Sequence, residues 1–324
     1  MRIRVKALAA AIGFMAYGMI AGVYADEPYP SKVIRFIVPF ASGTSTDQLA
    51  RAIGQAISRE TKQQVIVENK PGANGFIGAD AAARSAPDGY SVFITTNTTQ
   101  VAAEHLYKKL PYDPVKDFAP ITALGKGGMV MVVNASSSYN SINDIISAAK
   151  KSPGKITFAS GNSSSRIGGE LFQQLTGIQL LHVPYKSNTF AVTDLLGGAI
   201  DMMVVDPATG ISYVKSGRLR ALGTSLSSRS PLLPELPTIS ELGVKGYDIG
   251  YWFAAYAPAK TPQPIINRLH ELITKAMKSQ EANTFYQSTG TEPFSTTPSG
   301  LATFQQSESE KWKIIVSKAG IEKE

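Results

Sequence analysis

Two stretches rich in serine and threonine have the residue types and spacing of an anion-binding site. They cover residues 40–46 and 160–166, and each lies between a short strand pattern and apolar residues at helical spacing. The first N–H groups of a helix lack internal partners and carry a partial positive charge. The simplest guest for such groups is a carboxylate. The alternative is ordinary helix capping, although both stretches are longer than a cap requires.

Polar residues that follow other predicted strands are candidates for completing this site. The hydroxyl-rich loop 96–100 follows a strand pattern at 90–95, and Asp206 ends the buried strand pattern 199–205. In open α/β sheets, ligands bind outside the carboxyl ends of strands. The candidate ligand-binding residues are Phe40, Ser42, Gly43, Thr44, Ser45, Thr46, Asn97, Thr98, Ser160, Asn162, Ser163, Ser164, Ser165, Arg166, Tyr185, Asp206, Thr209 and Trp252.

Three of these candidates have a second, purely structural interpretation. Arg166 could hold another carboxylate in a charge-assisted fork, or it could face solvent. Asp206 could accept hydrogen bonds from a ligand hydroxyl, ammonium or protonated carboxyl, or it could cap the next helix. Trp252 and its neighbours Tyr251 and Phe253 could form a wall of a cleft or pack in the core.

Motifs for catalysis and metal binding are weak in this sequence. His105, His182 and His270 have no metal-ligand spacing, and the chain contains no cysteine. The Ser-x-x-Lys patterns at 147–150 and 212–215 lack the partner motifs of penicillin-recognising enzymes, and no phosphate-binding or dinucleotide-binding glycine motif occurs. We therefore predict a binding protein with no enzymatic role, no metal and no cofactor. A secreted hydrolase that uses Ser163 or Ser164 is the alternative from another class.

Residues 1–25 have the pattern of a cleavable signal peptide. A basic start is followed by an apolar run that is short for a membrane span and by Val23-Tyr24-Ala25 before Asp26. These residues carry three positive charges and no acid, so the formal net charge of +7 falls to +4. That balance suits an anionic small ligand, and no Lys/Arg cluster with aromatic residues indicates nucleic acid. Without cysteine there is no lipid anchor, and we predict a periplasmic protein.

Strand and helix patterns alternate along the remaining chain. With 324 residues and 43% hydrophobic content, the chain is long enough for two lobes. The alternation predicts an α/β fold with parallel sheets covered by helices. Residues 26–126 and 250–324 are expected to form the first lobe and residues 127–249 the second. The chain would then cross twice between the lobes, which makes a hinge beside a cleft.

Seven short strings occur in an order that is typical of one protein family. They are Ile-Val-Pro-Phe at 37–40, Glu-Asn-Lys-Pro-Gly at 68–72, Ala-Pro-Asp-Gly-Tyr at 86–90, Leu-Pro-Tyr-Asp-Pro at 110–114, Gly-Glu-Leu-Phe at 169–172, Val-Pro-Tyr-Lys at 183–186 and Asp-Leu-Leu-Gly-Gly at 194–198. Along nearly all its mature length the chain resembles the Bug (Bordetella uptake gene) substrate-binding proteins of tripartite tricarboxylate transporters.

This resemblance implies a two-lobed periplasmic binding protein of type II, with mixed, mostly parallel sheets, that closes on its ligand like a flytrap. It implies a small carboxylate ligand held by N–H and hydroxyl groups of the turns at 40–46 and 160–165. The implied partners are the membrane subunits of such a transporter, and the implied state is a monomer. A receptor that presents its ligand to a membrane sensor kinase is an alternative on the same scaffold.

The chain departs from the family pattern in and beside the expected pocket. Residues 39–47 read Pro-Phe-Ala-Ser-Gly-Thr-Ser-Thr-Asp, whereas the family usually has Pro-Phe-Pro-x-Gly-Gly-x-x-Asp. Arg166 stands where histidine is common, and Asp206 stands where asparagine is common. The identity of the ligand therefore cannot be transferred from a relative.

Overall fold

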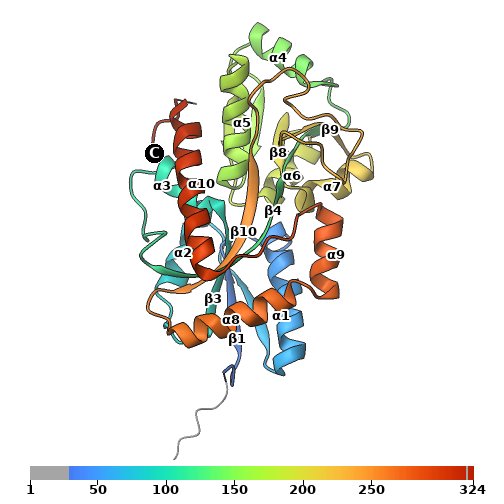
Figure 1. Ribbon diagram of the computed structural model, residues 1–324. Coiled ribbons are helices and arrows are strands. Elements are labelled where there is room, and N and C mark those ends of the chain that lie inside the picture. The colour runs from blue at the N-terminus through green and yellow to red at the C-terminus, as the bar shows by residue number, and fades with distance from the viewer. Residues whose placement is uncertain (1–28, 319) are drawn as a thin grey trace, which may run out of the picture.

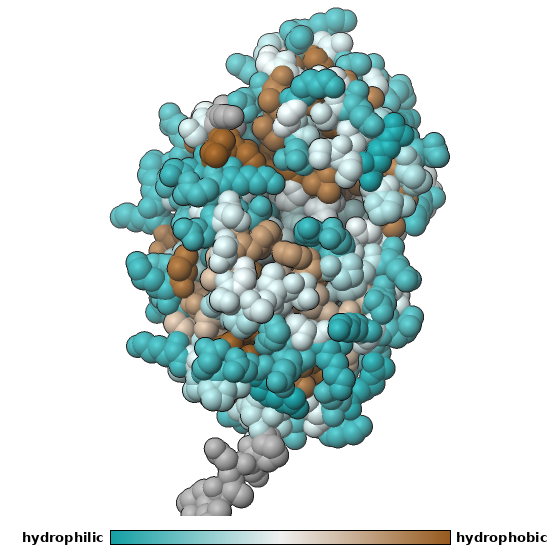
Figure 2. All heavy atoms as spheres, in the orientation of Figure 1, coloured by the Kyte–Doolittle hydropathy of each residue, from teal (hydrophilic) through white to brown (hydrophobic). Residues whose placement is uncertain are grey.

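The structure is a computed structural model that describes residues 29–318 and 320–324. The expected signal peptide at 1–25 lies outside the described residues. Within those ranges, no helix combines the length and the apolar character needed to cross a bilayer. Hydrophilic residues predominate on the face shown in Figure 2, and hydrophobic residues appear there in small groups.

Ten strands form two five-stranded sheets in the described part of the chain (Figure 1). The first sheet has the order β2-β1-β3-β10-β4 and contains β1 (Ile34–Val38), β2 (Val65–Asn69), β3 (Ser91–Thr96), β4 (Phe118–Gly128) and β10 (Gly250–Pro258). The second has the order β7-β6-β8-β5-β9 and contains β5 (Val130–Asn134), β6 (Thr157–Ser160), β7 (Leu181–Pro184), β8 (Met202–Val205) and β9 (Leu219–Thr224).

Both sheets are mixed and mostly parallel, as the sequence predicted. In the first sheet only β10 runs against the other four strands, and in the second only β5 does. The reversed strands are the ones that follow the two passages of the chain between the sheets.

Helices cover the sheets on both sides, because apolar residues recur along one face of each long helix. The helical segments are α1 (Ser45–Thr61), η1 (Ala73–Gly75), α2 (Phe76–Ala83), η2 (Thr98–Ala102), α3 (Ala103–Leu106), α4 (Ile142–Lys151), α5 (Ser163–Thr176), α6 (Asn188–Leu196), α7 (Pro207–Lys215), α8 (Gln263–Ala276), α9 (Gln280–Thr289) and α10 (Pro298–Lys318). The last of these, α10, follows the chain's return to the first sheet and packs against β4, η2 and α3.

The chain passes from the first sheet to the second at Met129 and returns at Ile249, and Ser225 connects the two passages. The N–H of Met129 donates to Ser225 Oγ at 2.7 Å, and that hydroxyl donates to the carbonyl of Ile249 at 2.6 Å. Ser225 also pairs through its backbone with Met129 at 2.9 Å and with Ile249 at 3.0 Å. Ser225, which is fully buried, thus forms hydrogen bonds with both passages of the chain between the sheets.

Two glycines bring α5 close to the second sheet. A Cβ on Gly169 would lie 2.3 Å from ring carbons of Phe158 on β6, and one on Gly168 would lie 2.8 Å from Val204 on β8. The close approach fixes the start of α5 against the carboxyl ends of these strands. Packing along the helix therefore positions the serine-rich turn that precedes it.

We expect Gly169→Ala to lower the free energy of unfolding by about 1–3 kcal/mol, because the added methyl group overpacks the contact with Phe158. Urea denaturation followed by circular dichroism measures the change. Gly197→Ala is the control: Gly197 has φ −78° at the end of α6, and its nearest neighbouring atom lies 3.5 Å from the added Cβ. That variant should be neutral or more stable by about 0.4–1 kcal/mol. Equal stability of the two variants would contradict the packing argument.

Candidate functional site

Helices begin directly after the carboxyl ends of strands in both sheets, and several of these beginnings surround one cavity. β1 leads to α1, β6 to α5, β7 to α6 and β8 to α7. The space left in the cavity is about 20 Å³, roughly room for one water molecule. It is lined by Phe40, Thr44, Ser45, Thr46, Thr96, Asn97, Met129, Asn162, Ser164, Ser187, Asn188, Asp206, Tyr251 and Phe253.

The turn before α1 is organised by Asp47, a residue that is 2% exposed. Its carboxylate accepts from the N–H of Gly43 at 2.8 Å, from Asn69 Nδ2 at 2.9 Å and from Arg51, with Nη2 at 2.9 Å. Burial acts to raise the pKa of Asp47, but the bonds from Arg51, Gly43 and Asn69 outweigh it, and the pKa lies below its usual value. The N–H of Gly43 is thereby used within the turn. Ser42 and Gly43 are both exposed to solvent and do not line the cavity.

The first two residues of α1 line the cavity. Thr44 caps the helix, because its hydroxyl accepts from the N–H of Asp47 and donates to the carbonyl of Ala41 at 2.8 Å. Ser45 and Thr46 are the next two residues, and their N–H groups precede the first intrahelical hydrogen bond. The turn therefore presents backbone donors and leaves Thr44 as a structural cap.

The turn before α5 repeats this arrangement in the second sheet. Asn162 caps the helix by accepting from the N–H of Ser165 at 2.9 Å. The N–H groups of Ser163 and Ser164 precede the first intrahelical bond, as those of Ser45 and Thr46 do in α1. The hydroxyl of Ser165 donates to the carbonyl of Val204, so it anchors the helix to β8.

Three hydrogen bonds connect these turns directly to the opposite sheet. Ser163 Oγ accepts from Asn74 Nδ2 at 2.6 Å, and Ser164 Oγ donates to Asn97 Oδ1 at 3.1 Å. The hydroxyl of Ser45 donates to the carboxylate of Asp206. The structure is therefore in a closed state, in which side chains from both sheets meet across the cavity.

Asp206 caps a helix, which is one of the two roles that the sequence left open, and it also lines the cavity. It caps α7 through the N–H of Thr209 at 3.1 Å, and its carboxylate also lines the cavity. Thr209 Oγ1 donates to the same carboxylate at 3.0 Å, and Asn188 Nδ2 does so at 3.2 Å. Thr209 thus lies behind Asp206 rather than at the cavity surface.

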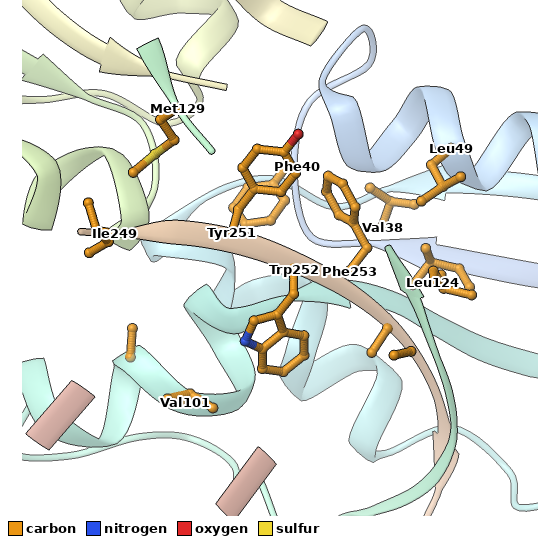
Figure 3. Close-up of a cluster of buried hydrophobic side chains, with 14 of the residues drawn as sticks. Val38, Phe40, Leu49, Val101, Leu124, Met129, Ile249, Tyr251, Trp252 and Phe253 are labelled. Carbon is orange, nitrogen blue, oxygen red and sulfur yellow. The ribbon is translucent and has the colours of Figure 1, made fainter. Parts of the chain in front are cut away.

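The apolar wall of the cavity comes from alternate residues of β10. Tyr251 and Phe253 project from one face of the strand, on the same side as Phe40, whereas Trp252 projects from the other (Figure 3). Trp252 Nε1 donates to Glu308 on α10 at 3.2 Å, and the indole lines a different cavity. The structure therefore separates Trp252 from the other candidate residues, because side chains alternate along a strand.

Five more candidates lie outside the cavity lining, and one of them is Ser163, whose hydroxyl accepts from Asn74. Arg166 pairs with Glu324 at 2.7 Å, and Tyr185 donates to Asp194 at 2.6 Å. Burial and this bond raise the pKa of Tyr185 to about 12. Ser160 bonds His182 at 2.7 Å, and Thr98 is fully buried beneath the site. These residues support neighbouring elements, and the cavity itself is formed by the helix beginnings.

Comparison with known proteins identifies the family. The sequence model described as tripartite tricarboxylate transporter family receptor matches residues 49–321. The chain belongs to this family. BugT from Bordetella pertussis is 34% identical to this receptor over 317 residues, which cover 97% of each chain.

Solved structures of similar proteins share the fold of this receptor. Periplasmic binding protein BugD has a TM-score of 0.87 and 31% identity, with 91% of this chain and 100% of BugD covered. An R. palustris protein solved with adipate has a TM-score of 0.86 and 29% identity, with 90% and 98% covered. The receptor is therefore a periplasmic-type solute-binding protein, and its family is one of binding proteins.

Three residues of the receptor line the cavity although the sequence did not single them out: Met129, Ser187 and Asn188. Thr96, Tyr251 and Phe253 also line it, and they lie in the loop 96–100 and the aromatic run 251–253 that the sequence offered as candidate walls. Ser187 and Asn188 follow β7 and begin α6, so they repeat the strand–polar turn–helix pattern in a shorter form. That pattern could have identified them. The position of Met129 depends on the crossing between sheets, which has no local signal.

We expect Asp47→Asn to lower the free energy of unfolding of the receptor at pH 7 by about 1–3 kcal/mol, because hydrogen bonds to the charged carboxylate are weakened. The pKa of Asp47 is lower in the folded state than its usual 3.8. Its contribution is therefore complete above about pH 4 and is lost as the pH falls below that value. Urea denaturation between pH 7 and pH 3 measures both effects.

The stability difference between wild type and Asp47→Asn should thus shrink at pH 3. Asp248→Asn is the control, since Asp248 is exposed and its replacement changes the net charge equally. A constant difference across the pH range would show that the ionised carboxylate of Asp47 does not stabilise the turn.

Proposed function

We propose that this receptor binds a small organic carboxylate between the beginnings of α1 and α5 and delivers it to the membrane subunits of a tripartite tricarboxylate-type transporter. The observation that carries the proposal is the pair of capped turns, which both contribute residues to the lining of one cavity. In each turn the cap satisfies the third N–H group and leaves two donors for a ligand. The adipate in the similar R. palustris protein is a ligand of the same chemical class.

The donors are sufficient in number for useful affinity. A hydrogen bond to a charged group contributes about 1.5–3 kcal/mol, so four N–H groups supply up to roughly 12 kcal/mol. Association costs at least about 4 kcal/mol. The difference permits micromolar binding, which suits a receptor that collects a dilute solute.

Binding requires the two halves of the molecule to separate first, because the closed cavity of about 20 Å³ is too small for a carboxylate of several carbons. Residues 26–126 with 250–324 form one lobe, and residues 127–249 form the other. They swing about the crossings at Met129 and Ile249. The bonds from Ser45 to Asp206 and from Ser164 to Asn97 open when a ligand enters.

The protein carries out no catalysis in this proposal. The hydroxyls of Ser163 and Ser164 bond the side chains of Asn74 and Asn97, which are amides and cannot act as bases. Burial and the nearby charge of Arg166 lower the pKa of His182 to about 4, and that ring bonds Ser160 outside the cavity.

The remaining parts of the proposal concern where and with what the receptor acts. Residues 1–25 direct export and are removed, so a monomer without a lipid anchor diffuses in the periplasm. Delivery to a transporter is favoured over presentation to a sensor kinase, because the matching family is one of transporter receptors. Loss of carboxylate uptake in a deletion strain, with gene induction intact, would separate these two roles.

Isothermal titration calorimetry with mono- and dicarboxylates tests the function directly. At least one compound should bind with micromolar or tighter affinity. If no carboxylate binds to folded, ligand-free protein, the proposed function is wrong.

We expect Ser164→Leu to weaken binding of that compound by at least about 100-fold, because the side chain would fill the small cavity beside the N–H donors. The melting temperature should change little relative to that loss. Ser307→Leu places the same side chain on the exposed face of α10 and should bind as wild type does. Unchanged affinity of Ser164→Leu would remove the beginning of α5 from the site.

A further inference from the structure

Asp206 places a negative charge in a cavity whose hydrogen-bond donors suit an anionic ligand. The residue is 9% exposed, and its carboxylate accepts only from neutral groups: Ser45, Asn188 and Thr209. Arginines in the neighbouring turns have other partners, since Arg51 pairs with Asp47 and Arg166 with Glu324. Within the described part of the chain, no ion pair includes Asp206.

Neutral hydrogen-bond donors surround the carboxylate of Asp206. Asp206 Oδ1 accepts from the N–H and hydroxyl of Thr209 at 3.1 and 3.0 Å, and Oδ2 accepts from Asn188 Nδ2 at 3.2 Å. None of these donors is charged, so none of them balances the negative charge of the carboxylate.

The cavity therefore contains groups that favour an anion and a group that favours a cation. The first N–H groups of α1 and α5 favour a carboxylate, whereas Asp206 repels a second carboxylate and attracts a cation. The contact from Ser45 shows where a ligand donor would be placed, because this hydroxyl crosses the cavity to reach Asp206 in the closed state. Tyr251 and Phe253 line the same cavity and offer aromatic surface beside a cationic group.

We propose that the ligand is a zwitterion, in which a carboxylate meets the helix beginnings and a protonated amine meets Asp206 in place of the Ser45 hydroxyl. This inference rests on the proposed function and specifies its substrate class as amino acids. Asp206 is then the residue that determines specificity. A ligand hydroxyl would also donate to Asp206, but it would not neutralise the charge.

Matched compounds separate these possibilities by calorimetry at pH 7. The sets are propionate, lactate and alanine; succinate, malate and aspartate; and glutarate, 2-hydroxyglutarate and glutamate. Within each set the compounds differ only in whether one carbon carries hydrogen, a hydroxyl or an ammonium group. In at least one set, the amino member should bind wild type at least about tenfold more tightly than both other members.

Asp206→Asn should reduce that ratio to less than about threefold, because the amide keeps the shape of the side chain but carries no charge. Asp80→Asn is the control: it removes a charge from an exposed pair with Arg84 on α2 and should leave the ratio unchanged. Melting temperatures of both variants check that they are folded.

The outcomes distinguish this inference from the function on which it rests. Tightest binding by an unsubstituted or hydroxylated acid in every set that binds would overturn the zwitterion and leave carboxylate binding intact. An amino preference that survives Asp206→Asn would overturn the role of Asp206. Absence of binding by all nine compounds and by the wider carboxylate panel would overturn the inference and the proposed function together.

Discussion

The unpaired N–H groups at the beginnings of α1 and α5 are the constraint to which the rest of the structure responds. Such groups are costly to bury without a partner, yet both helices begin inside the molecule. The structure meets this constraint by capping one N–H in each turn and by holding the remaining pairs next to a small polar cavity. Asp47, Asn162 and the close packing at Gly169 all serve to keep the two helix beginnings in place.

Features that depend on neighbouring residues could be predicted from the sequence. The α/β class and the two hydroxyl-rich turns follow from strand periodicity and from capping residues, which are local signals. The mixed sheets were implied by the family resemblance. The position of Trp252 could not be derived in this way. Which face of β10 borders the cavity depends on its pairing with β3 and β4, and those strands are more than a hundred residues away in the chain. A shift of one residue in the strand register moves the indole to the opposite face of the sheet.

Arg166 illustrates the same limit at the edge of the site. Its place at the start of α5 suggested a ligand contact, but its guanidinium pairs with Glu324, a residue 158 positions later. Asp206 lies between these cases. Its capping role was visible from the following Pro-Ala-Thr, whereas its contact with Ser45 requires the two sheets to be brought together. Local patterns thus located the turns, and the long-range packing decided which side chains meet there.

The four hydrogen bonds of Ser225 restrict how the molecule can move. Because they join both crossing segments at one buried point, neither segment can slide along the other without breaking several bonds at once. The backbone torsions on either side of Met129 and Ile249 can still change without breaking these bonds. A rotation about these two positions would keep the four bonds and change the distance between the two helix beginnings. Shear and twist are suppressed, so a guest of the wrong length would prevent full rotation rather than be accommodated by sideways adjustment.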